Sequence, residues 1–185
     1  MAYQITVFGG SQPKPGEPDY QQAYLLGRLI GQAGYTVMTG GYIGAMEAVS
    51  RGAAETGGHV IGITCDEIEA WRPVKPNPWL CEEIRFPTMR QRLFALIDKC
   101  DAALALPGGV GTLTEICLMW NLLLIAAIPS RPLITIGAGW QAVMQQLFAH
   151  NGSYIPEGQR QHLHQALTVE SAFRQLQEML SSGKV

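Results

Sequence analysis

Short apolar runs alternate along the chain with longer segments whose apolar residues recur every three or four positions. The short runs have the length of strands and lie at residues 5–8, 35–38, 59–63, 83–86, 102–106 and 132–136. The longer segments have helical spacing and lie at residues 19–33, 44–56, 88–99, 112–125, 140–150 and 170–180. The pattern therefore predicts strands and helices that alternate about every 25 residues.

This alternation predicts an α/β fold with a parallel sheet covered by helices on both faces. Most of the predicted strands are apolar throughout, which is typical of strands buried on both sides. Residues 65–81 interrupt the pattern with three prolines and with Trp71 and Trp79, and we expect a long loop there. No linker or internal repeat divides the sequence, so residues 1–185 are expected to form a single domain.

Glycine-rich turns follow three of the predicted strands. They are Gly9-Gly10-Ser11, Gly40-Gly41-Tyr42-Ile43-Gly44 and Pro107-Gly108-Gly109-Val110-Gly111. Turns between strands and helices also need glycine for positive φ, so any single one leaves function and backbone geometry equally favoured. At the carboxyl ends of parallel strands, however, such turns let backbone N–H groups bind an anion at a helix N-terminus. Three together favour a phosphate-bearing small-molecule ligand.

Charge and hydropathy exclude several classes of partner. Lys and Arg number 13 against 15 Asp and Glu, no basic run occurs, and we therefore expect no nucleic-acid partner. The longest apolar stretch, residues 116–128, is interrupted by Asn121 and is shorter than the ~20 residues that cross a bilayer. The first ten residues lack a basic segment of the secretory kind. No membrane partner and a cytoplasmic location are the default expectations.

The cysteines follow no metal-binding or redox spacing. Cys65, Cys81, Cys100 and Cys117 lie 16, 19 and 17 residues apart, so we expect free thiols that pack as small apolar residues, Cys117 included. No metal site and no cofactor are predicted. A dinucleotide-binding G-x-G-x-x-G, a G-x-x-x-x-G-K-[ST] loop and a G-x-S-x-G elbow are all missing from the sequence, which disfavours dehydrogenases, P-loop NTPases and α/β-hydrolases.

One segment carries a family resemblance. Residues 107–115, PGGVGTLTE, match the PGGxGTxxE signature of the LOG ("lonely guy") family, once misnamed lysine decarboxylases. Met89-Arg90-Gln91-Arg92 resembles the start of that family's M-x-x-R-K element, and residues 40–46 resemble its second glycine turn. The resemblance implies a homodimeric, Rossmann-like protein. It also implies hydrolysis of the N-glycosidic bond of purine or cytokinin nucleoside 5′-monophosphates, which releases the base and ribose 5-phosphate.

The resemblance assigns roles that agree with the chemistry of the residues. Breaking the C1′–N bond builds positive charge on the ribose, which the carboxylate of Glu115 would stabilise. Arg92 stands at the family's catalytic arginine position, where a permanent cation offsets charge on the departing base. The residues expected to hold the phosphate and the nucleotide are Gly10, Ser11, Gly40, Gly41, Gly44, Met89, Arg90, Pro107, Gly108, Gly109, Val110, Gly111 and Thr112.

Structural alternatives remain open for these residues. Thr112 and Glu115 have the spacing of a capping box, in which the glutamate bonds back to the helix start. Arg92 could be a solvated helix residue, and the two tryptophans of residues 65–81 could either stack on a base or anchor their loop. Leu93 replaces the family's lysine and Glu47 replaces a small residue. Such changes occur in related proteins that bind without hydrolysis, among them molybdenum-cofactor carriers, so a carrier of a phosphate-bearing pterin is the alternative function.

The apolar segment at residues 116–128 also bears on assembly. Charged residues make up 15% of the chain against a usual value of about 25%. The segment, with Met119 and Trp120, is longer than one internal face requires. We therefore expect part of it to pair across a twofold axis in a homo-oligomer, either a dimer or a tetramer.

Overall fold

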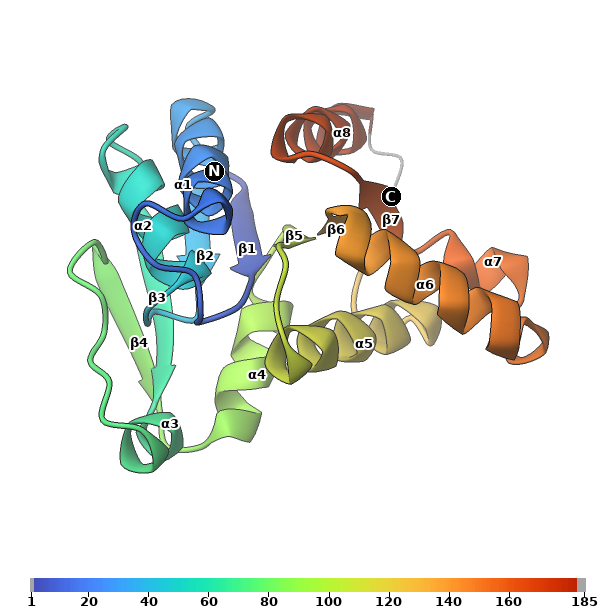
Figure 1. The fold of residues 1–185 in the computed structure, drawn as a ribbon, viewed down its shortest axis with the longest axis horizontal. Helices are drawn as coiled ribbons and strands as arrows, with labels where there is room; N and C mark the ends of the chain where they lie inside the picture. Colours follow the sequence, from blue (N-terminus) through green and yellow to red (C-terminus); the bar gives the residue numbers. More distant parts are fainter. Residues whose placement is uncertain (1, 183–185) are drawn as a thin grey trace.

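Seven parallel strands form the sheet at the centre of the molecule (Figure 1). The computed structural model describes residues 2–182. The sheet order is β4-β3-β2-β1-β5-β6-β7, and each pair of neighbours is parallel. The strands are β1 (Gln4–Phe8), β2 (Thr36–Thr39), β3 (Val60–Cys65), β4 (Glu82–Phe86), β5 (Ala102–Ala105), β6 (Leu133–Ile136) and β7 (His164–Ala166).

Helices cover both faces of this sheet (Figure 1). One face carries α1 (Pro18–Gln32), α2 (Ala45–Ala54) and α8 (Val169–Ser182), and the other carries α4 (Met89–Asp98), α5 (Val110–Leu124) and α6 (Ala138–Asn151). Side chains alternate between the two resulting cores, as Val7 and Phe8 of β1 do. The predicted α/β, Rossmann-like fold is therefore confirmed.

Two glycines let α1 and α2 pack closely. A Cβ atom on Gly27 would lie 2.1 Å from the carbonyl oxygen of Val49, and one on Gly52 would lie 2.1 Å from that of Tyr24. No side chain fits at either position, so part of the glycine content serves contact between helices.

Some of the smaller elements differ from the sequence-based expectation. The predicted loop at residues 65–81 contains a short helix, α3 (Asp66–Trp71), and the polar segment before α8 contains α7 (Glu157–Arg160), a 3-10 turn (Gly152–Tyr154) and the edge strand β7. Helix α5 begins at Val110, two residues before the predicted start. The short edge strand escapes detection because its residues, HQA, form no apolar run.

The glycine-rich turns meet at one edge of the sheet. The sheet order reverses between β1 and β5, and ligands of open parallel sheets bind at such a point, outside the carboxyl ends of the strands. The N–H of Gly10 donates to the carbonyl of Pro107 (3.1 Å), and the N–H of Ala45 donates to the carbonyl of Gly10 (2.9 Å). The three turns are thus joined to one another.

Burial corrects two expectations about apolar residues. Cys65 and Cys100 are buried as expected, whereas Cys81 and Cys117 are exposed. Cys117 lies on α5 but does not belong to the core against which that helix packs. Met119 and Trp120 are 0% and 7% exposed and pack against the sheet within this chain. They are therefore internal side chains rather than the face that a second copy would cover.

Membrane-crossing helices and clusters of metal ligands are both missing from the part of the chain that the structure describes. Within residues 2–182, none of the helices combines the length and the apolar character that a bilayer crossing demands. Over the same range, no three His, Cys, Asp or Glu side chains gather as metal ligands would.

Candidate active site

A cleft of about 450 Å³ opens where the glycine-rich turns meet. Its walls come from the turn after β1, the turn and helix start after β2, the segment of α3, and the first turns of α4 and α5. The lining residues are Gly9, Gly10, Ser11, Gln12, Tyr42, Met46, Ile68, Trp71, Arg72, Met89, Arg92, Gly109, Val110, Gly111, Thr112 and Glu115. The cleft thus occupies the switch point of the sheet.

The structure brings most of the sequence-predicted site residues together in this cleft. Gly10, Ser11, Met89, Arg92, Gly109, Val110, Gly111, Thr112 and Glu115 line it, whereas Gly40, Gly41, Gly44, Arg90, Pro107 and Gly108 do not. Arg90 is exposed on α4. The other non-lining residues belong to the turns that support the cleft from behind.

Three of these supporting glycines are required by close contacts. A Cβ atom on Gly40 would lie 2.0 Å from Nη2 of Arg92, and one on Gly108 would lie 2.2 Å from Oγ1 of Thr112. Gly44 has φ +77°, and a Cβ there would lie 2.6 Å from the carbonyl oxygen of Gly10. These glycines shape the site without facing its interior.

The start of α5 faces the cleft. Gly109 is the N-cap residue, so the N–H groups of Val110, Gly111 and Thr112 lack acceptors within the helix. A Cβ added to Gly109 or Gly111 would meet no described atom within 4 Å. Open space beside unbonded N–H groups at a helix start suits an anion.

The capping-box alternative for Thr112 and Glu115 is wrong. The N-cap is Gly109, three residues before Thr112, and no side chain caps α5 among the described residues. Thr112 and Glu115 therefore lie inside the helix, where they are 3% and 8% exposed and line the cleft. Helix capping therefore does not account for the burial of these two side chains.

Arg92 is buried rather than solvated. Its side chain is 4% exposed, and its Nε and Nη2 donate to the carbonyl oxygens of Ile63 (2.7 Å) and Gly40 (3.1 Å). Its guanidinium lies 5.8 Å from the centre of the Tyr42 ring, and Nη1 contacts Sδ of Met89 (3.8 Å). The two carbonyl bonds hold a permanent cation rigidly at the cleft wall.

The carboxyl group of Glu115 has a raised pKa. Burial raises its pKa to about 7, and the nearby positive charge of Arg92 opposes that rise. The carboxyl therefore exchanges its proton near neutral pH, which is a property of general acids and bases in enzymes.

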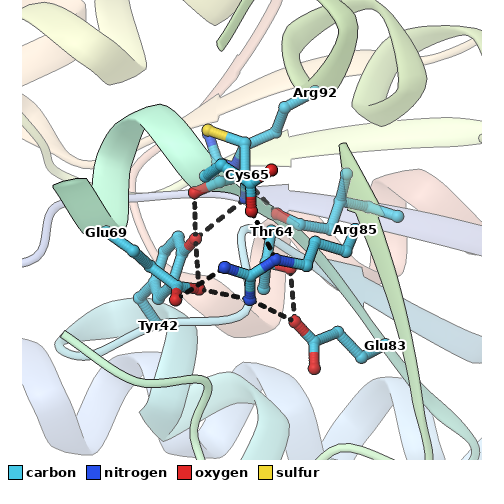
Figure 2. A network of polar contacts seen from close by, with 9 residues as sticks. Tyr42, Thr64, Cys65, Glu69, Glu83, Arg85 and Arg92 are labelled. Carbon is cyan, nitrogen blue, oxygen red and sulfur yellow. Dashed lines mark hydrogen bonds and ion pairs between the residues drawn. The ribbon is translucent and has the colours of Figure 1, made fainter. Parts of the chain in front are cut away.

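A polar network fastens α3 beside the cleft (Figure 2). Arg85 of β4 donates to both carboxylate oxygens of Glu69 (2.9 and 2.8 Å). The hydroxyl of Tyr42 donates to the carbonyl of Cys65 (3.0 Å) and accepts from its N–H (2.9 Å). Glu67 accepts from the N–H of Met89 at the start of α4 (2.7 Å). These bonds fix the helix that carries Ile68 and Trp71.

Sequence reasoning missed several lining residues. Gln12, Tyr42, Met46, Ile68 and Arg72 belong to the cleft but to none of the predicted phosphate-binding positions. Trp71, one of the two tryptophans noted in the sequence, lines the cleft and is 79% exposed.

The remaining two sequence features lie outside the cleft. The ring of Trp79 packs under the guanidinium of Arg51 (5.4 Å), so this tryptophan anchors its loop. Glu47 does not line the cleft, and its carboxylate accepts a hydrogen bond from the hydroxyl of Tyr20 (3.3 Å).

Comparison with known proteins shows the family of the chain. A family model described as the SLOG cluster4 family matches residues 2–156. The chain belongs to the SLOG cluster4 family. This membership covers the whole cleft, because every lining residue lies within the matched range.

Curated relatives of this SLOG cluster4 protein include nucleotide hydrolases. A cytokinin riboside 5′-monophosphate phosphoribohydrolase of Rhodococcoides fascians is 34% identical over 112 residues, which are 60% of this chain and 56% of the relative. A pyrimidine/purine nucleotide 5′-monophosphate nucleosidase of Escherichia coli K12 is 32% identical over 161 residues, 79% of this chain and 34% of the relative. The matched parts thus span about half and a third of these relatives.

A solved structure of a cofactor-binding protein has the same fold as this SLOG cluster4 chain. The molybdenum cofactor binding protein of Rippkaea orientalis superposes with a TM-score of 0.76 at 25% identity and covers 97% of this chain and 98% of its own. Hydrolases and cofactor binders are therefore both among the similar proteins.

Proposed function

We propose that the protein hydrolyses the N-glycosidic bond of purine nucleoside 5′-monophosphates, cytokinin nucleotides included, and releases the free base and ribose 5-phosphate. The observation that carries the proposal is the buried Glu115 carboxyl, whose pKa is raised to about 7, beside the buried cation of Arg92 in one cleft. Similarity to named phosphoribohydrolases and nucleosidases supports the same reaction class.

The start of α5 would hold the 5′-phosphate. Its free N–H groups from Val110 to Thr112 face open space, and the helix dipole favours an anion there by about 0.3–2 kcal/mol. Glu115 lies one helical turn further along α5. A phosphate fixed at the helix start therefore brings the ribose toward this carboxyl, and such positioning lowers the barrier without further chemistry.

Glu115 and Arg92 would divide the chemical work. As the C1′–N bond breaks, its electron pair leaves with the base, and positive charge develops on the ribose. The ionised Glu115 carboxylate stabilises that charge and accepts a proton from the water whose oxygen bonds to C1′. Arg92 offsets the negative charge of the departing base, which takes up a proton from solvent, and Glu115 returns its proton to solvent to restore the carboxylate.

A carrier function is the second candidate, favoured by the structural neighbour. The molybdenum cofactor binding protein of Rippkaea orientalis matches over nearly the whole of both chains. In that case the same helix start would hold the phosphate of a pterin, and Leu93 and Glu47 would mark the departure from the hydrolase pattern.

One assay separates these functions. The pure protein is incubated with AMP, GMP or an isoprenoid-adenine monophosphate, and free base is measured by chromatography. Release of base that depends on Glu115 supports the hydrolase. No turnover, together with a rise in Tm on adding a monophosphorylated pterin or molybdate, supports the carrier instead.

A further inference from the structure

One arginine at the wall of the cleft has no carboxylate partner. Arg72 follows α3 directly, is half-buried and lines the cleft. Its Nη1 donates to Oγ of Ser11 (3.3 Å), which is the one hydrogen bond that its side chain makes within residues 2–182. None of the ion pairs in that range includes Arg72. Its positive charge is therefore left for a ligand.

Two other arginines of this region are committed to partners in the fold. Arg92 uses Nε and Nη2 to bind two backbone carbonyl oxygens. Arg85 is paired with the carboxylates of Asp66 and Glu69. Arg72 differs from both, because a single hydroxyl group holds one end of its guanidinium.

The two unbonded nitrogens of Arg72 differ in exposure. Nε is buried and has no hydrogen-bond partner among the described residues. Nη2 also lacks a partner there, but it is not enclosed by the protein. A ligand can therefore reach Nη2 and not Nε. Because the guanidinium is a planar fork, Nη2 can donate to a ligand oxygen while Nη1 stays on the hydroxyl of Ser11.

The bond to Ser11 places Arg72 near the start of α5. Ser11 follows Gly10 in the turn after β1. A Cβ added to Gly108 would lie 2.2 Å from Oγ1 of Thr112 and 3.0 Å from the backbone nitrogen of Gly10, so this turn adjoins the first turn of α5. The arginine thus stands on the side of the cleft that carries the free N–H groups of α5.

The charges of the cleft also favour an anion beside Arg72. The charged side chains that line the cleft are Arg72, Arg92 and Glu115. Burial raises the pKa of Glu115 to about 7, so the lining is net positive near neutral pH. The cation that acts on Glu115 is Arg92, which leaves Arg72 as the cation for the other end of the ligand.

We propose that Arg72 is a phosphate-binding residue that completes the anion site at the start of α5. Its Nη2 donates to one phosphate oxygen, while the N–H groups from Val110 to Thr112 bind the others. Ser11 is a positioning residue, because its hydroxyl holds Nη1. The inference rests on the phosphate placement of the proposed function and names the side chain that offsets the phosphate charge.

Calorimetry with ribose 5-phosphate tests this assignment without turnover. Arg72→Met is expected to raise the Kd about 10- to 100-fold, the range of a hydrogen bond between charged groups. Arg72→Lys keeps the charge without the planar fork and should lose less. Ser11→Ala should weaken binding in the parent protein but not in Arg72→Met, because the serine acts through the arginine.

Salt dependence separates a charge contact from a merely structural role. The Kd of the parent for ribose 5-phosphate should rise with NaCl concentration, because salt screens the attraction between the arginine and the phosphate. The rise should be smaller in Arg72→Met and preserved in Arg72→Lys. A variant that only loosened the fold would keep the salt dependence of the parent.

Matched controls accompany these variants. Arg174→Met removes the same charge from an exposed position on α8 and should leave the affinity unchanged. Gly109→Ala alters the start of α5 itself and serves as the reference for a damaged phosphate site. Thermal unfolding of each variant verifies that it is folded.

Four outcomes would overturn the inference. They are a normal affinity of folded Arg72→Met, an unchanged salt dependence in that variant, losses from Ser11→Ala and Arg72→Met that simply add, and a parent that binds neither ribose 5-phosphate nor inorganic phosphate. If Gly109→Ala weakens binding and Arg72→Met does not, the phosphate site at α5 stands without the arginine. A parent that binds ribose 5-phosphate through Arg72 but releases no base would contradict the proposed hydrolysis and leave this inference standing.

Discussion

Arg92 and Glu115 line one cleft without forming an ion pair within the described residues. The Arg92 guanidinium donates to the carbonyls of Ile63 and Gly40 instead, while Glu115 lies buried on the neighbouring helix α5. A charged pair in direct contact would lower the pKa of the glutamate, yet burial raises it to about 7. The two groups therefore stay available to a ligand rather than neutralising each other.

Glu115→Gln should remove hydrolysis and preserve the fold. Glutamine has the same size but no negative charge, so it stabilises neither the ribose cation nor the attacking water, and we expect kcat to fall by about 10²-fold or more. Base release from AMP and GMP measures this effect. Because Glu115 caps no helix end, the variant should unfold at a Tm no lower than that of the parent protein. A fully active variant would rule out the catalytic role.

The stability of the protein should depend on pH through Glu115. Its folded-state pKa of about 7 lies above the ordinary 4.5, so the folded state binds the proton more tightly than the unfolded chain does. The associated stability is complete below pH 4.5 and is lost as pH rises toward 7, by about 3 kcal/mol in total. Denaturant unfolding from pH 4.5 to 8 should show this loss in the parent and not in Glu115→Gln, and parallel curves would contradict it.

Activity should follow the same ionisation with the opposite sign. The proposed reaction needs the carboxylate, so kcat/KM for GMP should rise with pH through about 7, the pKa of Glu115 in the free protein. A profile measured from pH 5.5 to 8.5 checks this rise. A flat profile would place the ionisation of Glu115 outside the rate-determining step.

Arg92→Lys should show that geometry matters as well as charge. Lysine keeps the positive charge but has no planar fork to reach the carbonyls of Ile63 and Gly40 together. We expect a loss of about 1–3 kcal/mol in the free energy of unfolding, and a fall of about 10²-fold in kcat. Arg28→Lys, an exposed substitution on α1, is the control and should change neither quantity.

The alternation of apolar runs was enough to predict the α/β fold, because the strands of this sheet are buried on both faces by helices of regular periodicity. The small elements were harder to predict from the sequence. Helix α3 lies in a proline-rich segment, and β7 has one neighbour and a polar sequence. Neither carries the hydrophobic period on which prediction depends.

The candidate site was predictable only in part. The glycines of residues 107–115 mark that segment in the sequence, whereas Arg72 lines the cleft because it directly follows the unpredicted helix α3. The Arg92 bonds span 29 and 52 residues of sequence to reach Ile63 and Gly40. Contacts at such separations leave no local pattern, so burial of Arg92 could not be read from its helix.

Two glycine substitutions should separate the framework of the site from its ligand contacts. Gly44→Ala places a Cβ at φ +77° and 2.6 Å from the carbonyl oxygen of Gly10, so we expect a loss of about 2–4 kcal/mol in the free energy of unfolding. Gly109→Ala meets no described atom within 4 Å and should cost less than about 0.5 kcal/mol.

The binding of ribose 5-phosphate completes this comparison. The methyl group of Gly109→Ala would occupy the space proposed for the phosphate. The Kd of this variant for ribose 5-phosphate should therefore rise by about tenfold, a loss of about 1.4 kcal/mol in binding free energy. Denaturant titration and calorimetry measure the two effects. If Gly109→Ala binds normally, the phosphate lies elsewhere.

We predict that the protein assembles into a homo-oligomer through exposed apolar side chains on α4 and α5. Met119 and Trp120 point inward, whereas Ile125 at the end of α5 is 66% exposed and Phe94 of α4 is 39% exposed. Exposed apolar side chains on adjacent helices are typical of surfaces that a second copy covers. Light scattering at micromolar concentration should give at least twice the chain mass of 20.2 kDa.

A charged substitution locates this face. Phe94→Glu should shift the mass toward one chain, because an unpaired carboxylate is costly to bury between copies. Val143→Glu alters a similarly exposed apolar residue on α6 and should leave the mass unchanged. A parent protein of 20.2 kDa would refute the oligomer, and a shift caused only by Val143→Glu would move the interface to α6.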